Sequence, residues 1–161
     1  MTEPEKYYLT KEGLKDMKKE RDKLLKLRKL KSKENVPSVM HSDELSAEFV
    51  SYREDLEFLE SRLEEIDRIF KNYELIKKPP KKERERVCLG AYVSLKINGE
   101  KDEFRIVGTT EANPSAGKIS NESPVGKALL GKKADEEIIV SSPQKKTYKI
   151  LNIKYKSSWG K

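Results

Sequence analysis

Residues 47–73 read AEFVSYREDLEFLESRLEEIDRIFKNY, and their apolar side chains recur at alternating spacings of three and four residues. This a/d heptad pattern predicts a long helix whose apolar seam packs on a second helix. At about 1.5 Å per residue the helix would be about 40 Å long. The seam consists of Phe49, Tyr52, Leu56, Leu59, Leu63, Ile66, Phe70 and Tyr73.

The segment before this helix supplies its partner. Thr10 is a typical N-cap residue and predicts that a helix begins beside it. Arg21 and Arg28 occupy two positions of the expected seam, where their aliphatic stems can pack along the facing helix. Pro37 then ends the helix and turns the chain, so we expect the two helices to run antiparallel. The apolar residues of the first helix recur at helical spacings: Leu14, Met17, Leu24, Leu25, Leu27 and Leu30.

The charges of the two segments are nearly equal and opposite. Residues 6–33 hold twelve Lys/Arg and four Asp/Glu, a balance of +8, whereas residues 43–67 hold two and ten, a balance of −8. This favours antiparallel pairing, although each exposed ion pair contributes only a few tenths of a kcal/mol. Residues 80–161 carry the remaining excess, +7, which indicates an anionic partner.

The second half of the chain changes to a period of two residues, which is typical of strands. Asn98-Gly99 is a strong signal for a two-residue hairpin turn. Ser123-Pro124 predicts the N-cap and first residue of a short helix that ends near Gly131. The expected strands are Val87–Leu95, Phe104–Val107, Ile138–Val140 and Tyr148–Ile153.

The chain is therefore expected to be an α+β protein of two domains. An antiparallel α-helical coiled-coil hairpin occupies residues 1–76, with its tip at about residues 35–46. A basic, proline-containing linker spans residues 77–85. Residues 86–161 form an antiparallel β-sheet domain with one short helix.

Composition excludes several classes of protein. Of the 161 residues, 39% are charged and 35% hydrophobic, and no window approaches the roughly 18–20 apolar residues of a membrane span. We therefore expect no membrane partner. One cysteine and one histidine allow neither an internal disulfide nor a Cys/His zinc site. A cytoplasmic location is expected.

Short motifs along most of the chain follow one known family in order and spacing. In the first domain they are Thr10-Lys11-Glu12-Gly13-Leu14 and Phe58-Leu59-Glu60-Ser61-Arg62. In the second they are Gly90, Ile106-Val107-Gly108, Glu111-Ala112-Asn113, Gly117-Lys118-Ile119-Ser120, Ser123-Pro124 and Ala128-Leu129-Leu130-Gly131-Lys132. On these motifs the chain resembles the bacterial Gre transcript-cleavage factors, GreA and GreB.

The resemblance implies a fold and a function. The fold is an N-terminal coiled-coil hairpin followed by an FKBP-like C-terminal domain. The partners are bacterial RNA polymerase and the 3′ end of nascent RNA in a backtracked complex. The hairpin would enter the polymerase through its secondary channel, with the FKBP-like domain on the channel rim. A monomer of this kind is an accessory factor that stimulates the polymerase's intrinsic RNA cleavage, and not an enzyme itself.

The hairpin tip departs from the family motif His-Gly-Asp-Leu-Ser-Glu-Asn-Ala-Glu-Tyr. The corresponding segment here is 41-HSDELSAEF-49. By resemblance, Asp43 stands where the family has its catalytic Asp, while the catalytic Glu has no counterpart. Glu44 is the nearest substitute, and Glu48 matches the outer Glu. Pro37 lies where the family continues as a helix, so we expect a tip of different shape.

By resemblance, Asp43 and Glu44 are the catalytic pair and ligands of a Mg²⁺ ion shared with the polymerase. Mg²⁺ prefers hard oxygen donors and is usually held by one or two carboxylates plus a substrate phosphate. In two-metal chemistry such an ion positions the attacking water. The alternative is that both acids cap the helix that begins near Ser46. His41, a lone histidine near a turn, is typical of a surface residue.

Lys31, Lys33 and Arg53 flank the tip and are candidates for contact with the RNA 3′ segment. Cations near phosphates gain affinity through counterion release. The alternative for each is a solvated position on a helix face.

Two other functions stay open. One is a Gre-like inhibitor that occupies the secondary channel of RNA polymerase without stimulating cleavage, which the altered acids at Glu44 would suit. The other is a prolyl isomerase, suggested only by the FKBP-like fold. Fold alone does not license that activity.

Overall fold

The computed structural model describes residues 5–34, 36–37, 40–41, 44–141 and 143–156. The chain separates into two compact units. The first, the hairpin unit, comprises residues 14–72. The second, the sheet unit, comprises the residues up to Gly13 together with those from Tyr73 onward. The N-terminal segment, expected in the hairpin domain, thus groups with the sheet.

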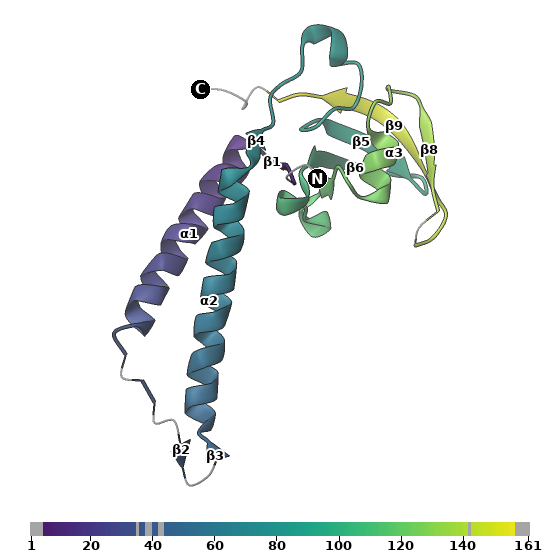
Figure 1. The fold of residues 1–161 in the computed structure, drawn as a ribbon. Coiled ribbons are helices and arrows are strands. Elements are labelled where there is room, and N and C mark those ends of the chain that lie inside the picture. The colour runs from purple at the N-terminus through teal and green to yellow at the C-terminus, as the bar shows by residue number, and fades with distance from the viewer. Residues whose placement is uncertain (1–4, 35, 38–39, 42–43, 142, 157–161) are drawn as a thin grey trace. The chain divides into compact units, whose positions relative to one another are not determined.

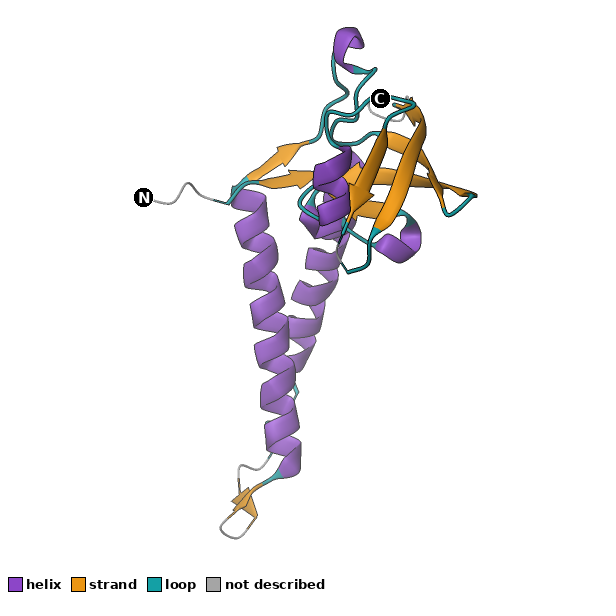
Figure 2. Cartoon of the chain, turned by 90° about the vertical axis from the view of Figure 1, so that its right-hand side faces the viewer, coloured by secondary structure: helices purple, strands orange, loops and turns teal. Residues whose placement is uncertain are grey.

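The hairpin unit consists of α1 (Lys11–Lys31) and α2 (Ala47–Lys71), which run antiparallel (Figures 1 and 2). Ion pairs join the largely basic α1 to the largely acidic α2. Arg62 binds Glu20 through two parallel bonds, Nε to Oε1 at 2.7 Å and Nη2 to Oε2 at 3.0 Å. Further ion pairs between the helices join Arg21 to Asp67 and Lys31 to Asp55, both at 2.8 Å.

The heptad seam of α2 is confirmed over its central part. Leu59, Leu63 and Ile66 are buried as predicted. At the end of the helix the prediction is wrong in detail, because Ile69 is buried in place of Phe70. Tyr73 lies beyond the helix, at the start of a short strand.

The seam of α1 is buried only in its first part. Met17 and Leu24 are buried, whereas Leu27 and Leu30, which also recur at helical spacings, are 49% and 61% exposed. At this level Arg28 holds a seam position and lines a groove between the helices. Arg28 is exposed, so its charge stays in contact with water beside this groove.

The seam yields a stability prediction. Leu63 is 4% exposed, so Leu63→Ala should lower the free energy of unfolding of the hairpin by about 2–4 kcal/mol through lost contacts and a residual cavity. Phe58 lies on the same helix but is 69% exposed, and Phe58→Ala should cost less than about 0.5 kcal/mol. Urea denaturation followed by far-ultraviolet circular dichroism measures both. Equal effects of the two changes would contradict this packing.

The sheet unit is built on five strands in the order β7-β6-β5-β9-β8. Neighbouring strands are antiparallel except β6 and β7, which run parallel, an exception to the expected antiparallel sheet. The predicted hairpin turn is confirmed: Asn98 and Gly99 both have positive φ, 51° and 88°. The strands are β5 (Tyr92–Ile97), β6 (Glu100–Val107), β7 (Lys118–Ser120), β8 (Glu137–Val140) and β9 (Lys146–Lys154).

A short helix, α3 (Pro124–Leu129), completes the core of the sheet unit. Its predicted N-cap is confirmed, because the Ser123 hydroxyl accepts a hydrogen bond from the Gly126 N–H at 3.0 Å. Leu129 packs with the buried residues of the sheet, which include Val93, Leu95, Ile106 and Ile150. No helix within the described residues is long and apolar enough to cross a membrane.

Three single turns of 3₁₀ helix complete the described fold of the sheet unit: η1 (Lys81–Glu83), η2 (Thr109–Glu111) and η3 (Pro114–Ala116). The first of these lies inside the segment expected to be a linker.

Two further short strands, neither of them predicted, pair outside the five-stranded sheet. β1 (Tyr7–Leu9) and β4 (Tyr73–Leu75) pair in parallel, with Tyr7 opposite Tyr73. The Ile76 N–H continues the pairing by donating to the Leu9 carbonyl at 2.8 Å. Strands this short carry no readable period. Because β1 directly precedes α1 and β4 directly follows α2, the pair joins the two ends of the hairpin.

The first turn of α1 is held by a carboxylate from η2. Glu111 accepts hydrogen bonds from the Thr10 N–H at 2.6 Å and the Thr10 hydroxyl at 2.7 Å. The Thr10 oxygen in turn accepts from the Gly13 N–H at 3.0 Å, which confirms Thr10 as the N-cap. A Cβ at Gly13 would collide with the Glu111 carboxylate. In the same turn Glu12 pairs with Arg105 at 2.8 Å.

This contact also makes a prediction. Glu111→Ala should lower the free energy of unfolding by about 1–3 kcal/mol, because Thr10 is buried and its donors would lose their acceptor. The matched control is Glu100→Ala, an exposed acid on β6, with an expected effect below about 0.5 kcal/mol. Thermal and urea unfolding distinguish the two. If both variants unfold like the parent chain, Glu111 does not anchor the helix.

Candidate functional site

The hairpin tip contains a pair of very short strands. β2 (Met40–His41) and β3 (Glu44–Leu45) run antiparallel, with His41 opposite Glu44. The expectation of a tip that differs from a continuous helix agrees with this pairing. Asp43 lies outside the described residues, and for Glu44 only the backbone is described. The structure thus places the Glu44 backbone in the strand that leads into α2.

The start of α2 is capped by a side-chain hydroxyl. The Ser46 Oγ accepts a hydrogen bond from the Phe49 N–H at 3.2 Å, and Ser46 itself is buried. Glu44 belongs to the strand before this cap. Glu48 lies in the first helical turn and is exposed, where its charge suits the helix dipole. Among the described side chains, Ser46 supplies the cap of α2.

Lys31 takes part in the packing of the hairpin itself. Its Nζ lies 2.8 Å from Asp55 Oδ2, 3.8 Å from Glu34 Oε2 and 5.4 Å from the centre of the Tyr52 ring. The hydrogen bond to Asp55 raises the pKa of Lys31 above its ordinary value, with attraction to the same carboxylate adding to the effect. Lys31 is thus already paired with an acid of α2.

The other two predicted cations are more open. Lys33 lies in the turn after α1 and is exposed. Arg53 is 62% exposed and lies 3.5 Å from Glu57, one turn further along α2. The structure does not test RNA contact by any of the three, which stays a prediction. The structure shows that Lys31 is paired within the hairpin, whereas Lys33 and Arg53 are exposed at its surface.

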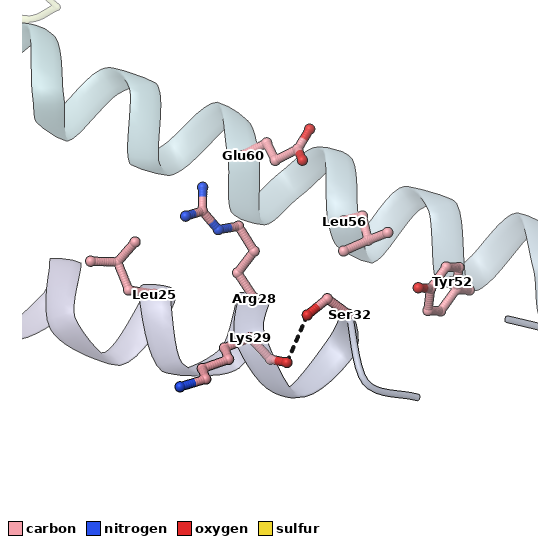
Figure 3. Close-up of a pocket in the computed structure, with 7 residues that line it drawn as sticks. All are labelled: Leu25, Arg28, Lys29, Ser32, Tyr52, Leu56 and Glu60. Carbon is pink, nitrogen blue, oxygen red and sulfur yellow. Dashed lines mark hydrogen bonds between the residues drawn. The ribbon is translucent and has the colours of Figure 1, made fainter. Parts of the chain in front are cut away.

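A groove of about 710 Å³ lies between the helices on the tip side of the buried seam (Figure 3). Arg28 extends from α1 toward α2 in this groove, with Leu56 and Tyr52 on the opposite wall. Sequence reasoning missed the groove because it placed the apolar wall residues in a closed seam, and only Arg28 signalled an opening. The lining residues are Leu25, Arg28, Lys29, Ser32, Tyr52, Leu56 and Glu60.

A smaller groove of about 480 Å³ adjoins the tip. It is lined by both Lys31 and Glu48, so the first turn of α2 and the last turn of α1 share a surface. Within the described ranges, no group of three or more His, Cys, Asp or Glu side chains is placed to hold a metal ion.

The contrast between Lys31 and Lys33 can be measured. Lys31→Ala should lower the urea midpoint of the hairpin, because Asp55 loses its partner and Tyr52 loses the overlying ammonium group. Lys33→Ala removes the same charge from an exposed turn and should leave the midpoint unchanged. A midpoint that shifts equally in both variants would show that general charge, and not this ion pair, is responsible.

Comparison with known proteins places these features in context. The family model described as "Transcription elongation factor, GreA/GreB, C-term" matches residues 81–155. The chain is similar to transcription elongation factor GreA of Thermomicrobium roseum, with 37% identity over 141 residues, 86% of this chain and 90% of that protein. GreA of Clostridium acetobutylicum is 36% identical over 159 residues, 96% of this chain and 100% of that protein.

The chain is also similar to a solved structure. GreA factor homolog 1 (Gfh1) of Thermus thermophilus is 23% identical, and the match covers 93% of this chain and 99% of that chain with a TM-score of 0.41.

Proposed function

Because this chain belongs to the GreA/GreB family of transcription elongation factors, we propose that it binds bacterial RNA polymerase and stimulates the polymerase's own cleavage of backtracked nascent RNA. The observation that supports this most is the antiparallel pairing of α1 and α2 with the acidic segment at the turn between them. The 25 residues of α2 carry that segment about 38 Å from the other end of the helix. The chain would act as a monomeric accessory factor in the bacterial cytoplasm.

The shape of the hairpin unit suits entry into a channel. Two helices side by side are about 20 Å across, and their ends are joined by the paired strands β1 and β4. In this proposal the hairpin enters the secondary channel of the polymerase, and the sheet unit stays at the channel rim. Docking and chemistry then depend on different parts of the chain.

Asp43 and Glu44 are the proposed ligands for a Mg²⁺ ion shared with the polymerase. Their chemistry fits, because both offer hard carboxylate oxygens and Mg²⁺ is commonly held by one or two carboxylates. The backbone supports the assignment of Glu44: it precedes the cap of α2, and Ser46 already fills the capping role. When bound, such an ion would help to position the water that attacks an RNA phosphate.

The RNA 3′ segment is proposed to contact the cations beside the tip. Lys33 and Arg53 have the more exposed charges, and Lys31 adds its charge while paired with Asp55. Phosphate contacts of this kind position a strand without reading its sequence. They would hold the extruded RNA beside the acids.

The test of the tip acids uses the full chain and a backtracked polymerase complex with labelled RNA. Asp43→Ala and Glu44→Ala should each reduce the rate of RNA cleavage by orders of magnitude, since each removes a metal ligand. Folding and binding to the polymerase should change little. Higher Mg²⁺ concentration should partly restore cleavage, because a lost ligand weakens metal affinity first. Glu48→Ala, a matched acid on the first turn of α2, should have a smaller effect.

The same assay decides between stimulation and inhibition. If the parent chain binds polymerase, stimulates no cleavage and slows elongation, and if Asp43→Ala relieves the slowing, the chain is a channel inhibitor and the proposal is wrong. If the parent chain does not compete with a known channel-binding factor for polymerase, the docking mode is wrong as well.

A further inference from the structure

Two basic segments of the sheet unit are joined by backbone hydrogen bonds. Residues 77–86 precede Val87, whose N–H donates to the Lys132 carbonyl and whose carbonyl accepts from the Gly131 N–H, both at 2.8 Å. Arg86 pairs with Lys133 in an isolated bridge. The cations that these two segments carry are called the basic patch: Lys77, Lys78, Lys81, Lys82, Arg84, Arg86, Lys132 and Lys133.

The two arginines of the basic patch brace its backbone. Arg84 Nε donates to the Pro79 carbonyl at 2.9 Å, which closes the loop around η1. Arg86 Nη1 donates to the Gly131 carbonyl at 3.0 Å and so ties one segment to the other. A guanidinium used in this way gives the loop a defined shape, which leaves the lysines to supply charge toward a partner.

Tyr155 fixes the end of the same loop. Its hydroxyl donates to the Arg86 carbonyl at 2.6 Å and accepts from the Cys88 N–H at 3.0 Å. Burial raises the pKa of the Tyr155 hydroxyl above its ordinary value. The backbone at Arg86 is therefore bonded to Tyr155 and also paired with Lys133.

The lysines of the basic patch are weakly neutralised. Lys81 and Lys82 are exposed, and their side chains form no ion pair with any residue that the structure describes. Lys132 and Lys133 lie 3.9 Å from Glu136 and Glu85, at the outer limit of an ion pair. Across residues 77–86 and 131–136 there are eight cations and four acids.

We propose that the basic patch binds the phosphate backbone of double-stranded nucleic acid without reading its sequence. Clustered lysines on a rigid loop gain affinity by releasing counterions from a polyanion. Lysine acts as a point charge without the planar fork that reads a base edge, so its contacts are with phosphate and carry no sequence information. This binding is independent of the tip acids and goes beyond the proposed cleavage function.

The composition of the basic patch favours a duplex over two other partners. Single strands are held largely by stacking on exposed aromatic rings, and the patch contributes none. Protein interfaces need an apolar centre. Among the described residues, the large exposed apolar side chains lie outside the patch: Leu27, Leu30, Val36, Phe58, Tyr73 and Ile139. The partner that suits the basic patch is therefore the regularly spaced row of phosphates along a duplex.

The test measures binding of the full chain to a labelled DNA duplex of about 20 base pairs, in two unrelated sequences, at NaCl concentrations from about 50 to about 200 mM. The double change Lys81→Glu with Lys82→Glu should weaken binding at least about tenfold and lower the slope of log K against log salt by about two. The matched control, Lys145→Glu with Lys146→Glu, makes the same change of net charge near the start of β9. It should weaken binding by less than about threefold, from general charge alone.

Each other outcome overturns part of this proposal. Equal weakening by both double variants would show that net charge, and not the basic patch, drives binding. Tighter binding of a single strand of the same length would refute the duplex, and tighter binding of an acidic peptide would point to a protein partner. Polymerase is absent from this assay, so failure here leaves the cleavage proposal standing. Asp43→Ala should bind the duplex like the parent chain.

Discussion

The buried strip formed by Leu59, Leu63 and Ile66 is the interaction on which the hairpin depends. A long helix in water gains most of its stability from tertiary packing, and full burial of one such side chain is worth about 1.5–3 kcal/mol. A partly exposed ion pair such as Glu20–Arg62 contributes about 0.2–1 kcal/mol. Burial therefore holds the helices together, and the ion pairs select the antiparallel register.

Hydrogen bonds hold the chain segments at the two ends of the hairpin. The parallel pair β1–β4 joins the strand before α1 to the strand after α2, and Glu111 holds the first turn of α1 through Thr10. Each contact uses backbone donors that would otherwise lack a partner at a helix start. The segments at the two ends of the hairpin are thus held by hydrogen bonds within the sheet unit.

The charged residues of the hairpin and those of the basic patch have different surroundings. In the hairpin, the ion pairs Arg21–Asp67 and Glu20–Arg62 join the two helices, and Lys31, beside the tip, is paired with Asp55. In the basic patch, Arg84 and Arg86 donate hydrogen bonds to backbone carbonyls, while Lys81 and Lys82 are exposed. The paired charges of the hairpin favour one register of α1 against α2. The exposed lysines of the basic patch, Lys81 and Lys82, can contact a partner.

The sequence by itself determined the elements whose signals are local and repeated. The heptads of α2, the N-caps Thr10 and Ser123, and the Asn98-Gly99 turn were all predicted, because period and turn chemistry act over a few neighbouring residues. The acids of the tip could be named from a motif, but their side-chain geometry could not.

Only the tertiary structure decided the features that join distant residues. It paired β1 with β4, brought Glu111 to Thr10, set residues 131–133 beside residues 84–87, and ended the seam of α1 before Leu27. Strands of three residues have no period to read, and a carboxylate shows no sign in sequence of the N–H that it will accept from about a hundred residues away. Which apolar residues are buried depends on how far two helices stay in contact, and that is a property of their packing and not of either sequence segment alone.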